Sequence, residues 1–158
     1  MTSIVSDATT LIVLAKLNRL DLLKTVFSSV LTPSLVYGEL QKKDDHDSEV
    51  RHDTFFVKKS ATETSVYLSL VSILDPGESE AIALALETGF PLLIDEKKGR
   101  TIAKSVGVSV IGMVGFLLIL RQKNILDEGA ILSLLDDAIQ IGFRVSQSLY
   151  EDFCRRIK

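Results

Sequence analysis

The stretch from Asp75 to Arg100 most constrains what this chain can fold into, because it carries signals for a helix, a turn, a strand and a second helix in succession. Asp75 is a good helix N-cap, and Pro76 suits the first helical position. Small apolar residues follow, as in a buried helix, and Gly89 is placed to end that helix. The short apolar run PLLID then predicts a buried strand, which leads directly into a basic helix.

The same alternation of strands and helices continues along the rest of the chain, which predicts an α/β fold with a mainly parallel central sheet. Strands are expected at residues 3–6, 29–32, 55–59 and 108–111, and helices at 8–18, 19–27, 33–43, 64–74, 97–107, 115–124, 127–142 and 146–158. Residues 42–53 are polar and dense in charge, and we expect a loop or a frayed helix end there.

The composition indicates one globular domain over residues 1–158, since 46% of the residues are apolar and 25% are charged. The net charge of −3 gives no long-range attraction for nucleic acid, so such a ligand would need a bound cation or a local basic patch. The single cysteine, Cys154, and the lack of a visible signal peptide favour a cytoplasmic setting. The most apolar run, residues 110–120, is shorter than the ~20 residues that span a bilayer, so no membrane segment is expected.

Four acidic residues stand beside apolar sequence at the ends of expected elements: Asp7, Glu39, Glu80 and Asp95. Asp7 and Asp95 follow strands, and the carboxyl ends of parallel strands meet at one edge of a sheet, where ligands bind. Crowded carboxylates repel one another unless a cation lies between them, and oxygen ligands with retained water suit Mg²⁺ or Mn²⁺. We therefore expect a divalent metal site, and hydrolysis of a phosphodiester by a metal-activated water is the chemistry that such a site supports.

Two residues near these acids are candidates for contacts with a substrate. Thr9 follows Asp7 by two positions, and its hydroxyl can orient a water or a phosphate oxygen. Arg100 is the candidate for a phosphate contact, because its guanidinium matches the geometry of phosphate oxygens. The neighbouring lysines at positions 97, 98 and 104 are expected to form a solvated helix face.

Each acid also has a purely structural interpretation. Asp7 and Asp95 can cap the helices that follow them, a role that is compatible with metal binding. Glu39 can be a solvated acid on a helix. Glu80 competes with Glu78 for a place in the site, because one of the two is expected to be a first-turn acid favoured by the helix dipole.

The chain resembles the PIN-domain family in three places. The opening of a PIN domain is similar to SDATTLIVLAKLNRLDLL, and its second acidic motif is similar to TPSLVYGEL. The prokaryotic PIN-like group DUF3368 is similar to DPGESEAIALALETGFPLLIDEKKGRTIA, followed by VIGMVGFLL and GFRVSQSLYEDF. The resemblance covers nearly the whole chain except roughly residues 42–71. It implies a three-layer α/β/α sandwich and, as in many PIN domains, a ribonuclease that depends on Mg²⁺ or Mn²⁺.

By this resemblance the four acids of the family's site fall on Asp7, Glu39, Glu80 and Asp95, as metal ligands and catalytic residues. The sequence departs from the commoner pattern at two points. Position 80 is Glu and not Asp, which moves the carboxylate by about one C–C bond length. The segment after the last acid reads DEKKGR where D-x-D-F is usual.

The sequence therefore predicts a metal-dependent endoribonuclease, toxin-like and controlled by a small antitoxin protein. A non-catalytic relative that binds RNA or a protein is the alternative. A small α/β phosphatase is a weaker third, because Thr9 stands where a second aspartate would follow Asp7. A homodimer is also expected, since the apolar residues at 11–23 and 114–120 exceed what one small core needs.

Overall fold

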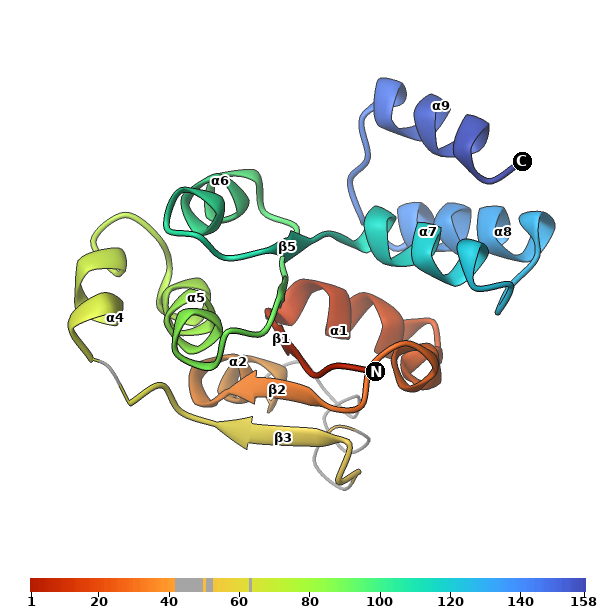
Figure 1. The fold of residues 1–158 in the computed structure, drawn as a ribbon. Coiled ribbons are helices and arrows are strands. Elements are labelled where there is room, and N and C mark those ends of the chain that lie inside the picture. The colour runs from red at the N-terminus through yellow and green to blue at the C-terminus, as the bar shows by residue number, and fades with distance from the viewer. Residues whose placement is uncertain (42–49, 51–52, 63) are drawn as a thin grey trace.

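The computed structural model describes residues 1–41, 50, 53–62 and 64–158. Its centre is a sheet in which every paired strand is parallel to its neighbour, with the order β3-β2-β1-β4-β5 (Figure 1). The strands are β1 (Ile4–Ser6), β2 (Val30–Pro33), β3 (Phe56–Lys59), β4 (Leu92–Leu93) and β5 (Val110–Ile111). The sequence prediction of an α/β fold with a parallel sheet is confirmed.

Helices connect these strands at nearly the positions that the sequence predicts. They are α1 (Ala8–Lys16), the 3-10 helix η1 (Leu20–Thr25), α2 (Ser34–Gln41), α4 (Thr64–Leu70), α5 (Pro76–Thr88), α6 (Lys97–Ser105), α7 (Met113–Gln122), α8 (Glu128–Gln140) and α9 (Gln147–Arg156). The capping signals that open the central stretch act as expected. The carboxylate of Asp75 accepts a hydrogen bond from the backbone N–H of Glu78, and Gly89 ends α5 in the left-handed conformation at φ 76°.

The sheet lies between two layers of helices, because successive residues of each strand point to opposite faces. Ile4, Val30 and Leu93 pack into a core shared with α1, α7 and α8. Their neighbours Val5, Leu31 and Leu92 pack into a second core, shared with α4, α5 and α6. The three-layer α/β/α sandwich is therefore confirmed, and Figure 1 shows the two groups of helices on either side of the strands.

The apolar run at residues 110–120 is used inside the fold. Phe116, Leu117 and Leu120 of α7 are fully buried and belong to the core that α8 and α9 also contact. This packing accounts for the apolar residues of that run on which the expectation of a homodimer partly rested. Within the described part of the chain, every helix is too short or too polar to span a bilayer.

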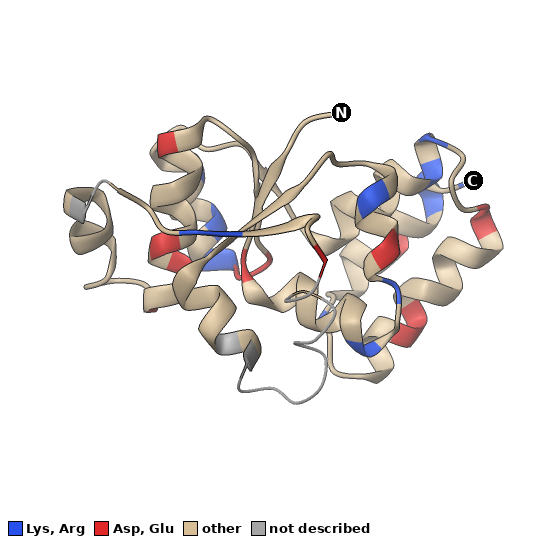
Figure 2. Ribbon diagram, turned by 90° about the horizontal axis from the view of Figure 1, so that it is seen from below, with Lys and Arg blue, Asp and Glu red and all other residues tan. Residues whose placement is uncertain are grey.

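The charged segment at 42–53 lies outside the described residues, apart from Val50 and Asp53. The chain resumes at β3, an edge strand whose outer part carries the exposed Lys58 and Lys59 (Figure 2). Charged side chains on an edge strand oppose pairing with the edge of another sheet.

Candidate active site

The strands β1 and β4 bring Asp7 and Asp95 to the same edge of the sheet. The two strands are adjacent and parallel, and each aspartate follows the last residues of its strand. The backbone N–H of Asp7 donates to the carbonyl oxygen of Leu93 at 2.9 Å, which continues the ladder up to the rim. The two acids that the sequence places after strands therefore lie at neighbouring positions on the carboxyl edge.

Asp7 is a buried acid, with 6% of its surface exposed. It occupies the N-cap position of α1 in an extended conformation, yet its side chain accepts no capping hydrogen bond from that helix. The residue marks the start of α1, but its carboxylate accepts no hydrogen bond from the first backbone N–H groups of that helix. This arrangement differs from a simple N-cap, the structural alternative for this position.

Asp95 is held by two donors that come from different parts of the chain. The hydroxyl of Thr10 donates to Oδ2 at 2.6 Å, and the backbone N–H of Met113 donates to Oδ1 at 2.8 Å. Met113 opens α7, so the carboxylate faces the positive end of that helix dipole. These contacts fix the orientation of the carboxylate from both sides.

The structural interpretation of Asp95, as the cap of the helix that follows it, does not hold. Glu96 is the N-cap of α6, and its Oε2 accepts from the backbone N–H of Gly99 at 2.8 Å. Because Glu96 caps α6, the carboxylate of Asp95 lies at the carboxyl edge of the sheet and makes its hydrogen bonds there. The sequence carried this signal in the three-residue spacing from Glu96 to Gly99, which is that of an N-cap to its N3 amide.

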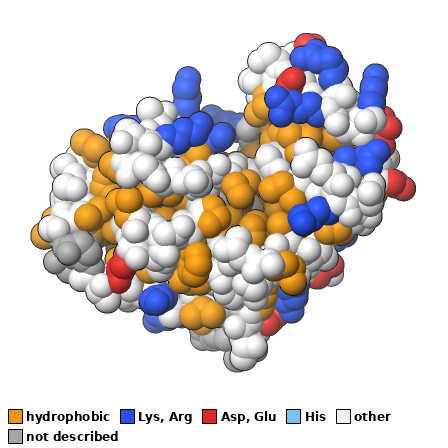
Figure 3. All heavy atoms as spheres, in the orientation of Figure 1, with side chains coloured by type: hydrophobic (Ala, Val, Ile, Leu, Met, Phe, Trp, Pro, Cys, Tyr) orange, Lys and Arg blue, Asp and Glu red, His pale blue; other side chains and the backbone are white. Residues whose placement is uncertain are grey.

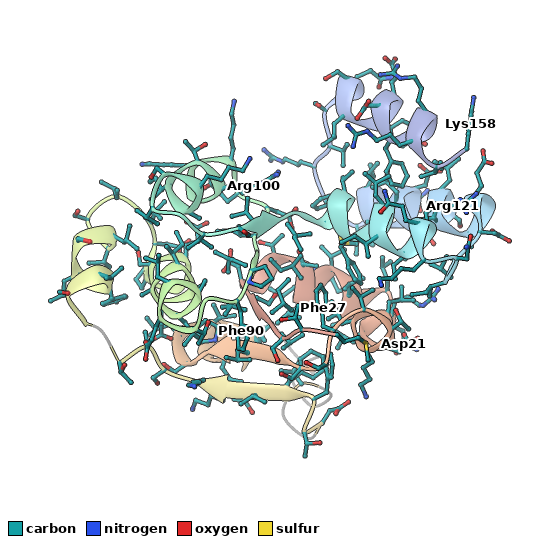
Figure 4. The ribbon with its side chains drawn as sticks, in the orientation of Figure 1. Asp21, Phe27, Phe90, Arg100, Arg121 and Lys158 are labelled. Carbon is teal, nitrogen blue, oxygen red and sulfur yellow. The ribbon has the colours of Figure 1, made fainter. Side chains whose placement is uncertain are left out.

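Arg100 lies beside Asp95, over Gly112. A Cβ atom added at Gly112 would be 3.2 Å from Oδ1 of Asp95 and 3.3 Å from Nη1 of Arg100. Figure 4 shows Arg100 on the side of α6 that faces α9. The buried Nε of Arg100 has no hydrogen-bond acceptor among the described residues. Arg100 also lines a cleft, and a guanidinium in such a place suits an anionic group such as phosphate.

Glu80 is engaged at the end of the neighbouring strand β2. The hydroxyl of Ser34 lies 3.0 Å and 3.2 Å from its two carboxylate oxygens, and the backbone N–H of Leu35 donates to Oε1 at 2.9 Å. Glu80, which belongs to α5, thus satisfies one backbone N–H group in the first turn of α2, that of Leu35. Since β1 lies between β2 and β4, Asp7 stands between the strand ends at which Glu80 and Asp95 are held.

Glu78, the competing acid of the same helix, is the more buried of the two, at 7% exposed. Its Oε2 lies 3.6 Å from the position that a Cβ of Gly99 would take, so its carboxylate reaches α6. Glu78 therefore points to the β4 side of the site, whereas Glu80 points to the β2 side. Glu39 lies in α2, but its side chain is outside what the structure describes.

The donor chemistry at the rim fits a divalent ion held by few protein ligands. No three Asp, Glu, His or Cys side chains among the described residues lie close enough to hold a metal. Mg²⁺ is nevertheless often bound by one or two carboxylates, with waters and substrate phosphates as the remaining ligands. Asp7 and Asp95 can supply such a pair of carboxylates.

Two clefts flank Asp95. One, of about 390 Å³, is lined by the exposed Thr9 together with Lys16, Asp95 and Arg144 among others. The other, of about 430 Å³, includes Asp95, Arg100, Arg144 and Arg156 in its lining. Thr9 and Arg100, the predicted substrate contacts, thus line different clefts that meet at one acid. Sequence reasoning missed Thr10, the partner of Asp95, and the segment around Arg144.

Comparison with known proteins identifies the family of the chain. A family model described as DUF3368: PIN domain matches residues 3–158. A search of curated proteins found no match. PIN domains are nuclease-type folds that in general use divalent metal ions. Because the match covers almost the whole chain, the protein belongs to the PIN-domain family DUF3368.

Proposed function

We propose that this protein is a metal-dependent endoribonuclease that hydrolyses phosphodiester bonds in RNA with Mg²⁺ or Mn²⁺. One observation carries the proposal. Asp7 and Asp95 end neighbouring parallel strands at one edge of the sheet, and Arg100 lies beside the second acid, with no acceptor for its Nε in the part of the chain that the structure describes. The two carboxylates suit a divalent ion, and the guanidinium of Arg100 beside them suits the phosphate on which that ion would act.

The side chains at the rim have separate tasks in this proposal. Asp7 and Asp95 would hold the ion, which when bound supplies an activated water and neutralises charge on the phosphate. Thr10 and the N–H of Met113 keep the Asp95 carboxylate in one orientation. Arg100 binds a non-bridging phosphate oxygen, and its charge stabilises the negative charge that develops during hydrolysis.

A third carboxylate is proposed from α5. Glu39 and Glu80 are the acids that the family resemblance points to, and Glu80 would have to share its oxygens with Ser34 and Leu35. The carboxylate of Glu78 reaches Gly99 in the first turn of α6, the helix that begins shortly after Asp95. The contacts therefore favour Glu78 over Glu80 for a role close to the ion, with Glu39 as a further candidate.

The alternative is a non-catalytic module that binds RNA or a protein partner and retains the acids. The observation that favours it is the lack of a three-ligand cluster among the described residues. Under this alternative Asp95 would serve mainly to join α1 to α7, through its bonds to Thr10 and Met113.

A toxin-like role in a cytoplasmic toxin–antitoxin pair, with a small antitoxin partner, is part of the same proposal. A homodimer stays a prediction as well. Sedimentation at micromolar concentration tests it, because a protein that remains monomeric under those conditions contradicts it. Growth arrest on expression, relieved by a gene encoded beside it, tests the toxin role.

The nuclease is tested by incubating the purified protein with single-stranded RNA in Mn²⁺ and, separately, in chelator. We expect cleavage only with the metal, and its loss in Asp7→Asn and in Asp95→Asn. Asp21→Asn is the matched control, because Asp21 is an exposed acid of η1, labelled in Figure 4 away from Arg100. Binding of RNA without cleavage under any divalent ion would favour the non-catalytic alternative.

A further inference from the structure

The strand β3 forms an open side of the sheet. It pairs with β2 on one side, and no other strand among the described residues pairs with it. Figure 2 shows β3 crossing the near side of the ribbon, with its basic half in blue. Two strands, β2 and β1, lie between β3 and β4, the strand that leads to Asp95. The open side is therefore separate from the proposed metal site.

The open side of β3 presents backbone groups in a regular order. The N–H of Val30 in β2 donates to the carbonyl of Phe55 at 3.0 Å. Next along the register, Leu31 lies opposite Val57. Because the bonds alternate along a parallel pair, the N–H and C=O of Val57 face β2, whereas those of Lys58 face outward. The outward groups make no bond to β2, and they are the groups with which a further strand can pair.

Both ends of β3 are fixed by side-chain contacts. Before the strand, the carboxylate of Asp53 accepts from the backbone N–H of Phe55 at 2.9 Å and forms an ion pair with Lys24. After the strand, the hydroxyl of Ser60 donates to that of Ser34 at 3.1 Å. The strand is therefore held extended by the protein itself, which lowers the entropic cost of adding another strand to it.

The side chains of β3 combine two cations with an exposed apolar residue. Lys58 and Lys59 are exposed, and successive side chains of a strand point to opposite faces, so each face carries one lysine. The Nζ of Lys58 lies 5.1 Å from the centre of the Tyr37 ring, and Val57 is 40% exposed. Figure 3 shows basic side chains next to hydrophobic ones at the lower rim, where β3 lies in Figure 1. The open side is thus locally basic on a chain whose net charge is −3.

These charges oppose one class of partner and favour another. The same strand of a second copy of this chain would bring lysines opposite lysines, and like charges directly across a strand pair are destabilising. Acidic side chains at the same positions would be attracted on both faces of the sheet. An apolar, β-branched residue opposite Val57 would cover the exposed part of that side chain.

We propose that β3 binds an extended acidic segment of a partner protein, which adds to the sheet as a further strand. Backbone hydrogen bonds to the outward groups of β3 supply affinity, and the two lysines select the acidic sequence. The inference goes beyond the proposed function and does not depend on it, because neither Asp7 nor Asp95 takes part in this contact.

The test uses the full-length protein and a fluorescein-labelled peptide of glutamate, valine and threonine, about ten residues long, which is the upper range of strand length. Anisotropy measures binding. We expect the affinity to fall as salt rises from about 10 to about 100 mM, because the Debye length shortens from about 30 to about 10 Å. A peptide with lysine in place of glutamate should not bind, and equal binding of the two would overturn the selection for acids.

A second peptide tests the backbone contact. Methyl groups on its backbone nitrogens leave the acidic side chains in place but remove the donors that a strand pair needs. We expect this peptide to lose binding. If it binds as well as the unmodified peptide, the contact is only electrostatic and the addition of a strand is overturned.

Lys58→Ala and Lys58→Pro separate the side chain from the backbone of β3. Both remove the cation, but only proline removes the outward N–H, and proline is tolerated on an edge strand when its nitrogen faces solvent. We expect alanine to weaken binding roughly 2- to 5-fold, and proline to weaken it by a further factor of roughly 2 to 12. Lys123→Ala, at an exposed lysine that follows α7, is the matched control and should bind like the original protein. Equal affinities of the two Lys58 variants would overturn the addition of a strand.

Hydrogen exchange measured by NMR tests the contact without any substitution, and it decides the question if melting shows that the proline variant does not fold. The amide of Lys58 should exchange faster than that of Val57 in the free protein. At a free peptide concentration about ten times the dissociation constant, exchange at Lys58 should slow roughly tenfold. Unchanged exchange there would overturn the inference. A dimer in sedimentation that Lys58→Pro abolishes would assign β3 to a second copy of the chain and overturn the acidic partner.

Discussion

Thr10 donates a hydrogen bond of 2.6 Å to Asp95, a residue 85 positions later in the chain. The threonine is 1% exposed and belongs to the first helix, whereas the aspartate follows the fourth strand of the sheet. The bond ties the β1–α1 unit to the end of β4, at the point where the two proposed metal ligands meet. The hydroxyl therefore holds the carboxylate of Asp95 in place.

Thr10→Val should reduce RNA cleavage while the protein remains folded. The variant keeps the shape of the side chain but removes a donor to a charged group, an interaction of about 1.5–3 kcal/mol. We expect weaker Mn²⁺ binding by calorimetry and a lower cleavage rate, with Thr10→Ser restoring most of both. Equal activity in the valine and serine variants would show that the bond does not position Asp95.

Gly112→Ala should lower the rate of RNA cleavage while changing the melting temperature little. Its new methyl group would lie 3.2 Å from Asp95 and 3.3 Å from Arg100, so both side chains would have to shift by a few tenths of an ångström. Gly129→Ala is the control, because its methyl group would meet Oδ1 of Asp127 at an ordinary 3.7 Å in the first turn of α8. We expect cleavage to fall only in the first variant. Thermal melting of both checks that the protein stays folded.

Substitutions of Glu80 and Glu78 should have different effects, because we expect Glu80 to stabilise the fold and Glu78 to contribute to metal binding. Glu80→Ala removes the acceptor of the Leu35 N–H and of the Ser34 hydroxyl, so we expect a loss of about 1–2 kcal/mol in unfolding free energy. Glu78→Gln should weaken Mn²⁺ binding with a smaller effect on stability. Urea unfolding and calorimetric titration measure the two effects. A loss of Mn²⁺ binding in Glu80→Ala, with unchanged binding in Glu78→Gln, would instead place Glu80 in the metal site.

Tyr150 should titrate later than an ordinary tyrosine. Its hydroxyl donates to Oδ1 of Asp136 at 2.7 Å, and this bond, together with burial, raises the pKa of Tyr150 to about 12. A raised folded-state pKa stabilises the protein below the ordinary value of about 10, and this stabilisation is lost as the pH rises through 12. Asp136→Ala should bring the absorbance titration of this tyrosine toward 10, whereas Asp137→Ala, the adjacent exposed acid, should leave it unchanged.

The elements of the fold were predictable because their signals are local. Asp75, Pro76 and Gly89 set the ends of α5 through backbone geometry, and alternation along β1 and β2 assigns neighbouring residues to opposite cores. The strand ends at Asp7 and Asp95 could also be placed on one edge, since parallel strands align their carboxyl ends. These rules need no knowledge of the tertiary packing.

The partners of the acids could not be predicted, because they depend on contacts between distant segments. Sequence spacing favoured Thr9, yet the helix turns Thr10 inward to Asp95 and leaves Thr9 exposed. Glu80 looked available, but it reaches the start of α2 and satisfies Leu35. Phe143 and Arg144 line both clefts at Asp95, and this position depends on how α8 and α9 pack on α7.

The central claim is that Asp7 and Asp95 together hold a divalent ion at the carboxyl edge of the sheet. Crystals grown with Mn²⁺ and measured near the manganese absorption edge test it most directly. The account predicts an anomalous density peak within about 2 Å of a carboxylate oxygen of each aspartate, and no such peak in Asp95→Asn crystals. The absence of a peak between these two residues at saturating Mn²⁺ would contradict it.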